Sequence, residues 1–131
     1  MNKTTENKPT RIQADRRTLL AELTYFTGDL ERYRHWSRRL IYTPGIQHLA
    51  KRAGAYWLID LVASWQMTPE VAQEDFQIWK LVVRADRTAT ATATGDGQKA
   101  LASQDIPFTD FPLEEITVWL VDGTLLLPSE Y

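Results

Sequence analysis

Residues 88–94 alternate threonine and alanine without exception, and this pattern restricts the fold more than any other stretch. A period of two puts successive side chains on opposite faces of a β-strand, so one face carries only alanine. Such a flat face suits the close approach of a helix. The glycine-rich sequence at 95–97 predicts a hairpin turn, so we expect residues 99–106 to return as an antiparallel strand.

Residues 55–66 predict a helix that is apolar around most of its circumference. Its polar side chains form one narrow stripe of Tyr56, Asp60 and Ser64, spaced one helical turn apart. Because nearly every face of such a helix needs cover, we expect it to be central to the fold.

Two Thr-Pro pairs mark further helix starts, because a hydroxyl caps the helix and proline suits its first turn. Thr43-Pro44 begins a helix that stops near Gly54, and Thr68-Pro69 begins a short helical turn.

The first helix is predicted to begin with Asp15 as its N-cap and to end near Gly28. Its apolar residues at helical spacing are Leu19, Leu20, Leu23 and Phe26. The preceding sequence is polar, so we predict a flexible tail over residues 1–14 and a single compact domain over 15–131.

The second half of the chain changes to the period of strands. Residues 76–84 predict a strand that is mostly apolar on both faces. Residues 113–122 are ambiguous: acidic residues resemble a first helical turn, whereas the β-branched run from 116 favours a strand. We predict a helix there, followed by a short strand at 125–127. The fold class is then α+β, with N-terminal helices packed on a small antiparallel β-meander.

Composition excludes several classes of protein. The chain has 131 residues, no cysteine and no apolar run long enough to cross a bilayer, so we expect a soluble, cytoplasmic protein that does not bind a membrane.

Residues 1–56 carry a net charge of +6 and residues 57–131 a net charge of −8. The two halves either attract each other within the fold or form separate patches for partners.

The main functional candidate is a stretch with four arginines and three aromatics in eleven residues, 32–42. Guanidinium groups need partners or water, so this stretch is hard to bury in a core. It predicts a surface for an anionic or aromatic partner, or else a long loop whose arginines are solvated or paired with the acidic half. The predicted partner-binding residues are Arg32, Tyr33, Arg34, His35, Trp36, Arg38, Arg39 and Tyr42.

A second candidate is a pocket around the polar stripe of Tyr56, Asp60 and Ser64, with His35 nearby. A carboxylate in an apolar setting would have a raised pKa, as a general acid or base needs. Alternatively, Asp60 faces water or pairs with an arginine of the first half. We find no catalytic motif and expect no cofactor; His35 and His48 alone do not make a metal site.

A helix start and the C-terminal segment offer further hypotheses. The helix start at Thr43-Pro44-Gly45 could hold a phosphate or carboxylate on its free N–H groups. The apolar C-terminal segment, residues 125–131, is expected to dock on its own fold rather than on a partner.

Six segments resemble an uncharacterised family of small bacterial proteins, a domain of unknown function with members in phages and other mobile elements. These segments are Tyr33–Trp36 (YRHW), Tyr42–Gly45 (YTPG), Ala53–Asp60 (AGAYWLID), Phe76–Leu81 (FQIWKL), Ile106–Leu113 (IPFTDFPL) and Leu127–Tyr131 (LPSEY). The resemblance covers residues 18–131 and implies no activity. It suggests one function class, a protein that binds and inhibits a host defence component.

The leading hypothesis is therefore a non-enzymatic protein that binds a protein partner through residues 32–42. One alternative is a small-molecule or enzymatic site around Tyr56, Asp60 and His35. Another is single-stranded nucleic acid binding along the basic stretch; the sequence pI of about 5.7 argues against generic duplex binding.

Overall fold

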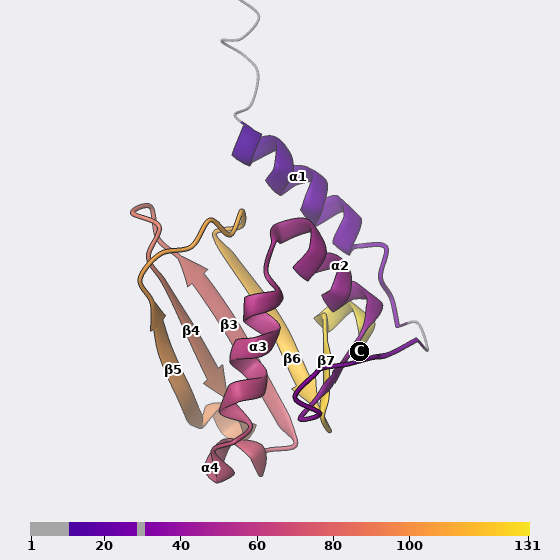
Figure 1. Cartoon of the computed structure of the whole chain (residues 1–131), viewed down its shortest axis with the longest axis vertical. Helices are drawn as coiled ribbons and strands as arrows, with labels where there is room; N and C mark the ends of the chain where they lie inside the picture. Colours follow the sequence, from indigo (N-terminus) through magenta and orange to yellow (C-terminus); the bar gives the residue numbers. More distant parts are fainter. Residues whose placement is uncertain (1–10, 29–30) are drawn as a thin grey trace, which may run out of the picture.

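The computed structural model describes residues 11–28 and 31–131. A seven-stranded sheet has the order β1-β2-β7-β6-β3-β4-β5 and is antiparallel except where β2 pairs with β7. Helices α2 and α3 lie across one face of this sheet, and α1 packs on α2 (Figure 1). The predicted α+β class with helices on one face is confirmed. The strands are β1 (Tyr33–Arg34), β2 (Ile41–Tyr42), β3 (Phe76–Val83), β4 (Ala89–Thr94), β5 (Ala100–Ile106), β6 (Glu115–Val121) and β7 (Thr124–Leu126); the helices are α1 (Arg11–Leu23), α2 (Pro44–Ala53), α3 (Tyr56–Trp65) and α4 (Pro69–Ala72).

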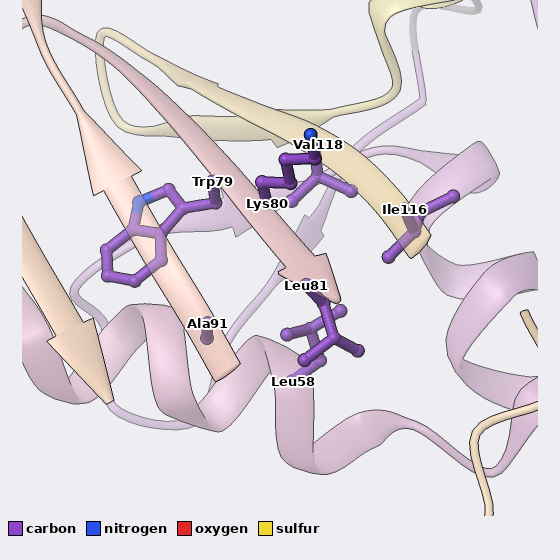
Figure 2. A pocket seen from close by; sticks show the side chains of 7 residues that line it. All are labelled: Leu58, Trp79, Lys80, Leu81, Ala91, Ile116 and Val118. Carbon is purple, nitrogen blue, oxygen red and sulfur yellow. The ribbon is translucent and has the colours of Figure 1, made fainter. Parts of the chain in front are cut away.

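The Thr-Ala strand packs as its pattern predicts. The alanines of β4 are at most 1% exposed, whereas the threonines between them are half-exposed on the other face. Ala91 lies opposite Leu81 of β3, and Leu58 of α3 lines the same narrow gap between the helix and this flat surface. Figure 2 shows Trp79 and Leu81 pointing toward the helix, while Lys80 points away from it. The small alanine side chains let α3 approach the sheet closely.

Local signals place α2 and α3 correctly. The Thr43 hydroxyl accepts a hydrogen bond from the Ile46 N–H at 3.3 Å, and Gly54 ends α2 with a φ of 62°. This left-handed backbone conformation favours glycine, because glycine has no Cβ atom to clash with the backbone. The polar side chains of α3 are exposed and its apolar side chains are mostly buried.

The predicted start of the first helix is wrong. Helix α1 runs from Arg11 through Asp15, which therefore is not its N-cap. It ends at Leu23, and Gly28 has its positive φ of 107° in the following loop, where an added Cβ would lie 3.2 Å from the Glu130 carbonyl. Of the predicted tail over 1–14, residues 11–14 belong to α1 and residues 1–10 lie outside the described part.

The helix predicted for residues 113–122 is also wrong. Residues 115–121 form strand β6, which pairs with β3 on one side and with β7 on the other. The β-branched run is stabilised there because neighbours on both sides satisfy its backbone groups. The sheet is also larger than predicted, since β6, β1 and β2 belong to it, whereas the short strand predicted at 125–127 is confirmed as β7.

Within the residues that the structure describes, no helix combines the length and the apolar character that crossing a bilayer requires.

Candidate functional site

The arginine-aromatic stretch folds as a hairpin at one edge of the sheet. Strands β1 and β2 form it, and residues 35–40 make its loop. The His35 N–H donates to the Leu40 carbonyl at 3.1 Å, and the Arg38 N–H donates to the His35 carbonyl at 2.9 Å. Arg38 has a φ of 66°, a conformation that is strained for a residue with a side chain. Such a turn persists only where its surroundings hold it in place.

Asp60 of α3 holds this loop from outside. The Nε2–H of His35 donates to Asp60 Oδ1 at 2.6 Å, and the Trp36 Nε1–H donates to the same oxygen at 3.1 Å. The His35 side chain is 4% exposed and that of Asp60 is 49% exposed. One carboxylate oxygen therefore joins the central helix to two successive residues of the loop.

Ser37 completes a chain of hydrogen bonds through His35. Its backbone N–H donates to His35 Nδ1 at 3.1 Å, which makes Nδ1 the acceptor and leaves the ring proton on Nε2. The Ser37 hydroxyl lies 2.7 Å from the same Nδ1 and accepts the Arg39 N–H at 3.2 Å. The three side chains Ser37, His35 and Asp60 are thus linked in series.

The outer side of the loop carries the exposed side chains. Trp36 is 80% exposed and lies against the His35 ring, with the ring centroids 5.0 Å apart. Arg34, Arg38 and Arg39 are exposed and form no side-chain hydrogen bond or ion pair with the described residues. The Arg32 guanidinium donates to the Glu31 carbonyl.

The two tyrosines of the stretch support the base of the hairpin. Tyr33 and Tyr42 stack with their ring centroids 5.6 Å apart, and both are half-buried. Burial raises the pKa of Tyr42 above its ordinary value of 10, with smaller contributions from Tyr56, Tyr33 and Asp60. Of the eight predicted binding residues, these two and His35 are therefore partly or wholly covered.

The polar stripe of α3 only partly converges on the hairpin. Asp60 meets His35, and Tyr56 lies within electrostatic reach of Tyr42. Ser64 instead donates to the Leu61 carbonyl of its own helix at 2.7 Å. Of the alternatives for Asp60, the structure agrees with a side chain that faces water, since it is half-exposed rather than set among apolar groups. Among the described residues its hydrogen-bond partners are His35 and Trp36, not an arginine.

Basic and acidic residues line the same open hollow beside the hairpin loop. Arg38 and Arg39 border a space of about 260 Å³ together with Asp75, which precedes β3, and Asp122, which follows β6. The charged halves of the chain thus approach each other here without an ion pair between these residues in the structure. An ion pair elsewhere does join the two halves: Arg16 Nη1 lies 3.5 Å from Glu114 Oε2.

The proposed anion site at the start of α2 is filled by the chain itself. The Glu130 carboxylate accepts the Thr43 hydroxyl at 2.6 Å, the Gly45 N–H at 3.0 Å and the Leu127 N–H at 2.9 Å. The expected docking of the C-terminal segment on its own fold is confirmed, with Leu125 and Leu127 in the core. Glu130 is not among the predicted site residues, although its place shortly after three leucines was a usable signal.

Comparison with known protein families shows that residues 17–131 match DUF6876, which is described as a family of unknown function. No curated protein and no solved structure matches the chain significantly. The match confirms the resemblance to an uncharacterised domain family.

Proposed function

The chain belongs to the DUF6876 family of unknown function, and on this premise we propose that it is a non-enzymatic binding protein. Its binding surface is the β1–β2 hairpin, and its partner is a protein with an acidic surface. The observation that carries the proposal is an exposed tryptophan fixed in place by a buried histidine and a carboxylate.

A fixed Trp36 is suited to binding because little side-chain freedom remains to be lost on association. Its Nε1–H is held by Asp60 and one ring face lies against His35, while 80% of the side chain remains exposed. Tryptophan, tyrosine and arginine dominate the energetics of protein interfaces, and immobilisation before contact increases affinity.

The arginines around this anchor favour an anionic partner. Arg34, Arg38 and Arg39 lie within three residues of Trp36 along the hairpin and have no ion-pair partner among the described residues. Guanidinium groups bind carboxylates in a bidentate manner, so an acidic surface would satisfy them. The nearby Asp75 and Asp122 limit the positive field, which favours a protein carboxylate over a nucleic acid backbone.

The test is a tagged pulldown from bacterial lysate, with and without nuclease, read by mass spectrometry. The triple variant Arg34→Ala/Trp36→Ala/Arg38→Ala should lose a stoichiometric protein partner and retain the fold by circular dichroism. Tyr25→Ala is the matched control because it removes an aromatic side chain that is 83% exposed outside the hairpin. Capture that survives the triple variant would contradict the assignment of the surface, and capture lost with nuclease would indicate nucleic acid instead.

We further propose that the partner is a host defence protein, which this chain inhibits. The resemblance to a family with members in phages and mobile elements supports this role. A partner identified by the pulldown would then lose activity when the intact protein, and not the triple variant, is added.

A second candidate function rests on the Ser37–His35–Asp60 chain. A serine, a histidine and an aspartate in series are the groups that activate a nucleophile in acyl transfer. Here, however, Ser37 Oγ also accepts a backbone N–H, and its contact is with Nδ1 rather than Nε2. A fluorophosphonate probe tests this alternative: a covalent adduct that is lost in Ser37→Ala would favour an enzyme.

A further inference from the structure

The two edges of the sheet differ in how they are protected. Strand β1 at one edge has two residues and carries Arg34. Strand β5 at the other edge has seven residues, ALASQDI, with a single charge at Asp105. Figure 1 shows β5 as the outermost strand, with no element beyond it. A long edge with little charge is a template for pairing with another strand.

The register shows which backbone groups of β5 are available. The Gly95 N–H donates to the Lys99 carbonyl at 2.7 Å, which closes the β4–β5 hairpin. Because antiparallel partners alternate between bonded and non-bonded pairs, the alanines of β4 bond to Ala102, Gln104 and Ile106. The N–H and C=O groups of Ser103 and Asp105 therefore point away from the sheet.

A register shift limits the usable edge to residues 102–106. One extra residue lies in β5 between the partners of Ala93 and Thr94, next to the hairpin turn. Beyond this irregularity the strand is regular until Pro107, which has no N–H to donate. Two outward-facing residues, Ser103 and Asp105, are thus framed by a bulge and a proline.

This short edge is complementary to itself. We propose that β5 pairs antiparallel with β5 of a second copy, about a two-fold axis through Gln104. Ser103 then lies opposite Asp105 of the other copy, where its hydroxyl can donate to the carboxylate on the same face. Asp105 already accepts the Thr90 hydroxyl with one oxygen, Oδ1, at 3.0 Å, and Oδ2 forms no hydrogen bond with the described residues.

The helix-side face fits the same register. Ala102 lies opposite Ile106 of the second copy, a small residue against a large one. Both are only partly buried at the margin of the core, as is Trp65 of α3. Gln104 accepts the Trp65 Nε1–H at 2.8 Å, so its amide group is held in place and keeps its own N–H groups for the second Gln104.

The arrangement joins both sheets into one and leaves each β1–β2 hairpin at an outer end. It is independent of the proposed function, because the two surfaces lie at opposite edges of the sheet. If the hairpin does bind a partner, the pair of copies would present it twice, which increases avidity for a partner with repeated sites.

The first experiment is sedimentation velocity of the full chain over a range of concentrations. We expect a species of twice the 15.1 kDa chain mass whose fraction rises with concentration. Ser103→Asp should weaken it about 2- to 30-fold, because it places two carboxylates opposite each other twice per dimer. Ser103→Lys should strengthen it by a similar factor. A chain that stays monomeric throughout, or that responds equally to both substitutions, would overturn the proposal.

A cross-link tests the register directly. The chain has no cysteine, so Gln104→Cys places a single thiol at the two-fold axis. Directly opposed residues of a non-bonded antiparallel pair have Cα atoms about 4.5 Å apart, within the range of a disulfide. We expect a disulfide-linked dimer on mild oxidation, and none from Thr92→Cys on the neighbouring strand. Equal cross-linking of the two variants would refute the two-fold register.

Discussion

Glu130 and Thr43 lie 87 positions apart in the chain and are joined by a hydrogen bond of 2.6 Å between buried side chains. The same carboxylate accepts backbone N–H groups from the first turn of α2 and from the C-terminal segment. A negative charge at a helix N-terminus is favoured by the helix dipole and by the unpaired N–H groups there. The C-terminal segment is thereby fastened to the helix layer.

Replacing Glu130 should therefore destabilise the protein. We expect Glu130→Ala to lower the free energy of unfolding by about 1–3 kcal/mol, since buried donors lose their acceptor. Urea denaturation measures the change. Ser129→Ala is the control, because the exposed Ser129 hydroxyl donates a single hydrogen bond within the described part of the chain, to the Phe26 carbonyl, and its loss should change stability by about 0.5 kcal/mol or less. Equal effects of both would mean that Glu130 does not cap α2.

Removing the Asp60 carboxylate should release the hairpin loop. Asp60→Ala leaves the buried Nε2–H of His35 without an acceptor, which costs about 1–3 kcal/mol. We also expect faster hydrogen exchange of the loop amides, because the strained turn at Arg38 loses its support. Ser64→Ala on the same helix is the control, since the Ser64 hydroxyl donates to the Leu61 carbonyl of its own helix and forms no hydrogen bond with the described residues of the loop. Unchanged hydrogen exchange of the loop amides in Asp60→Ala would show that the loop keeps its conformation without the Asp60 carboxylate.

The contact between α1 and α2 should weaken in acid. Hydrogen bonds from Arg52 and His48 hold the pKa of Glu22 below its ordinary value of 4.5. A lowered pKa in the folded state means that the ionised carboxylate stabilises the fold above about pH 4.5, and that this contribution disappears as the pH falls through the lower, folded value. Urea midpoints from pH 7 downward should fall less steeply for Glu22→Gln than for the wild type. If the urea midpoints of the two proteins fall in parallel with pH, the Glu22 carboxylate contributes nothing to the pH dependence of stability.

The alanine face of β4 should not tolerate a larger side chain. Ala91 lines a gap too small for a water molecule together with Leu58 of α3 and Leu81 of β3, all of which Figure 2 labels. Ala91→Leu should therefore cost about 1–3 kcal/mol through overpacking. Thr92→Val, on the half-exposed opposite face, is expected to be nearly neutral. Thermal denaturation compares the two, and a neutral Ala91→Leu would mean that α3 can move away.

Short-range signals account for most of the elements that were predicted correctly. Helix α2 begins at a Thr-Pro pair and ends at glycine, and β4 follows its alternation, because caps and periods act over a few residues. The helix predicted for residues 113–122 was wrong because its acidic start is a local signal, whereas strand pairing with β3 and β7 is not. The role of residues 32–42 as a binding surface remains a prediction, although the structure shows Trp36 and all four arginines of this stretch at the surface.

The sequence by itself determined the class of the fold, the flat alanine face and the central helix, since each depends on spacing along one segment. Only the tertiary structure decided that Asp60 binds His35 and Trp36, and that Glu130 occupies the start of α2. These contacts join residues 24 to 87 positions apart. Many residues in a chain could serve as partner to a given carboxylate, and hydrophobic packing of distant elements selects one of them. Local propensity carries no information about that selection.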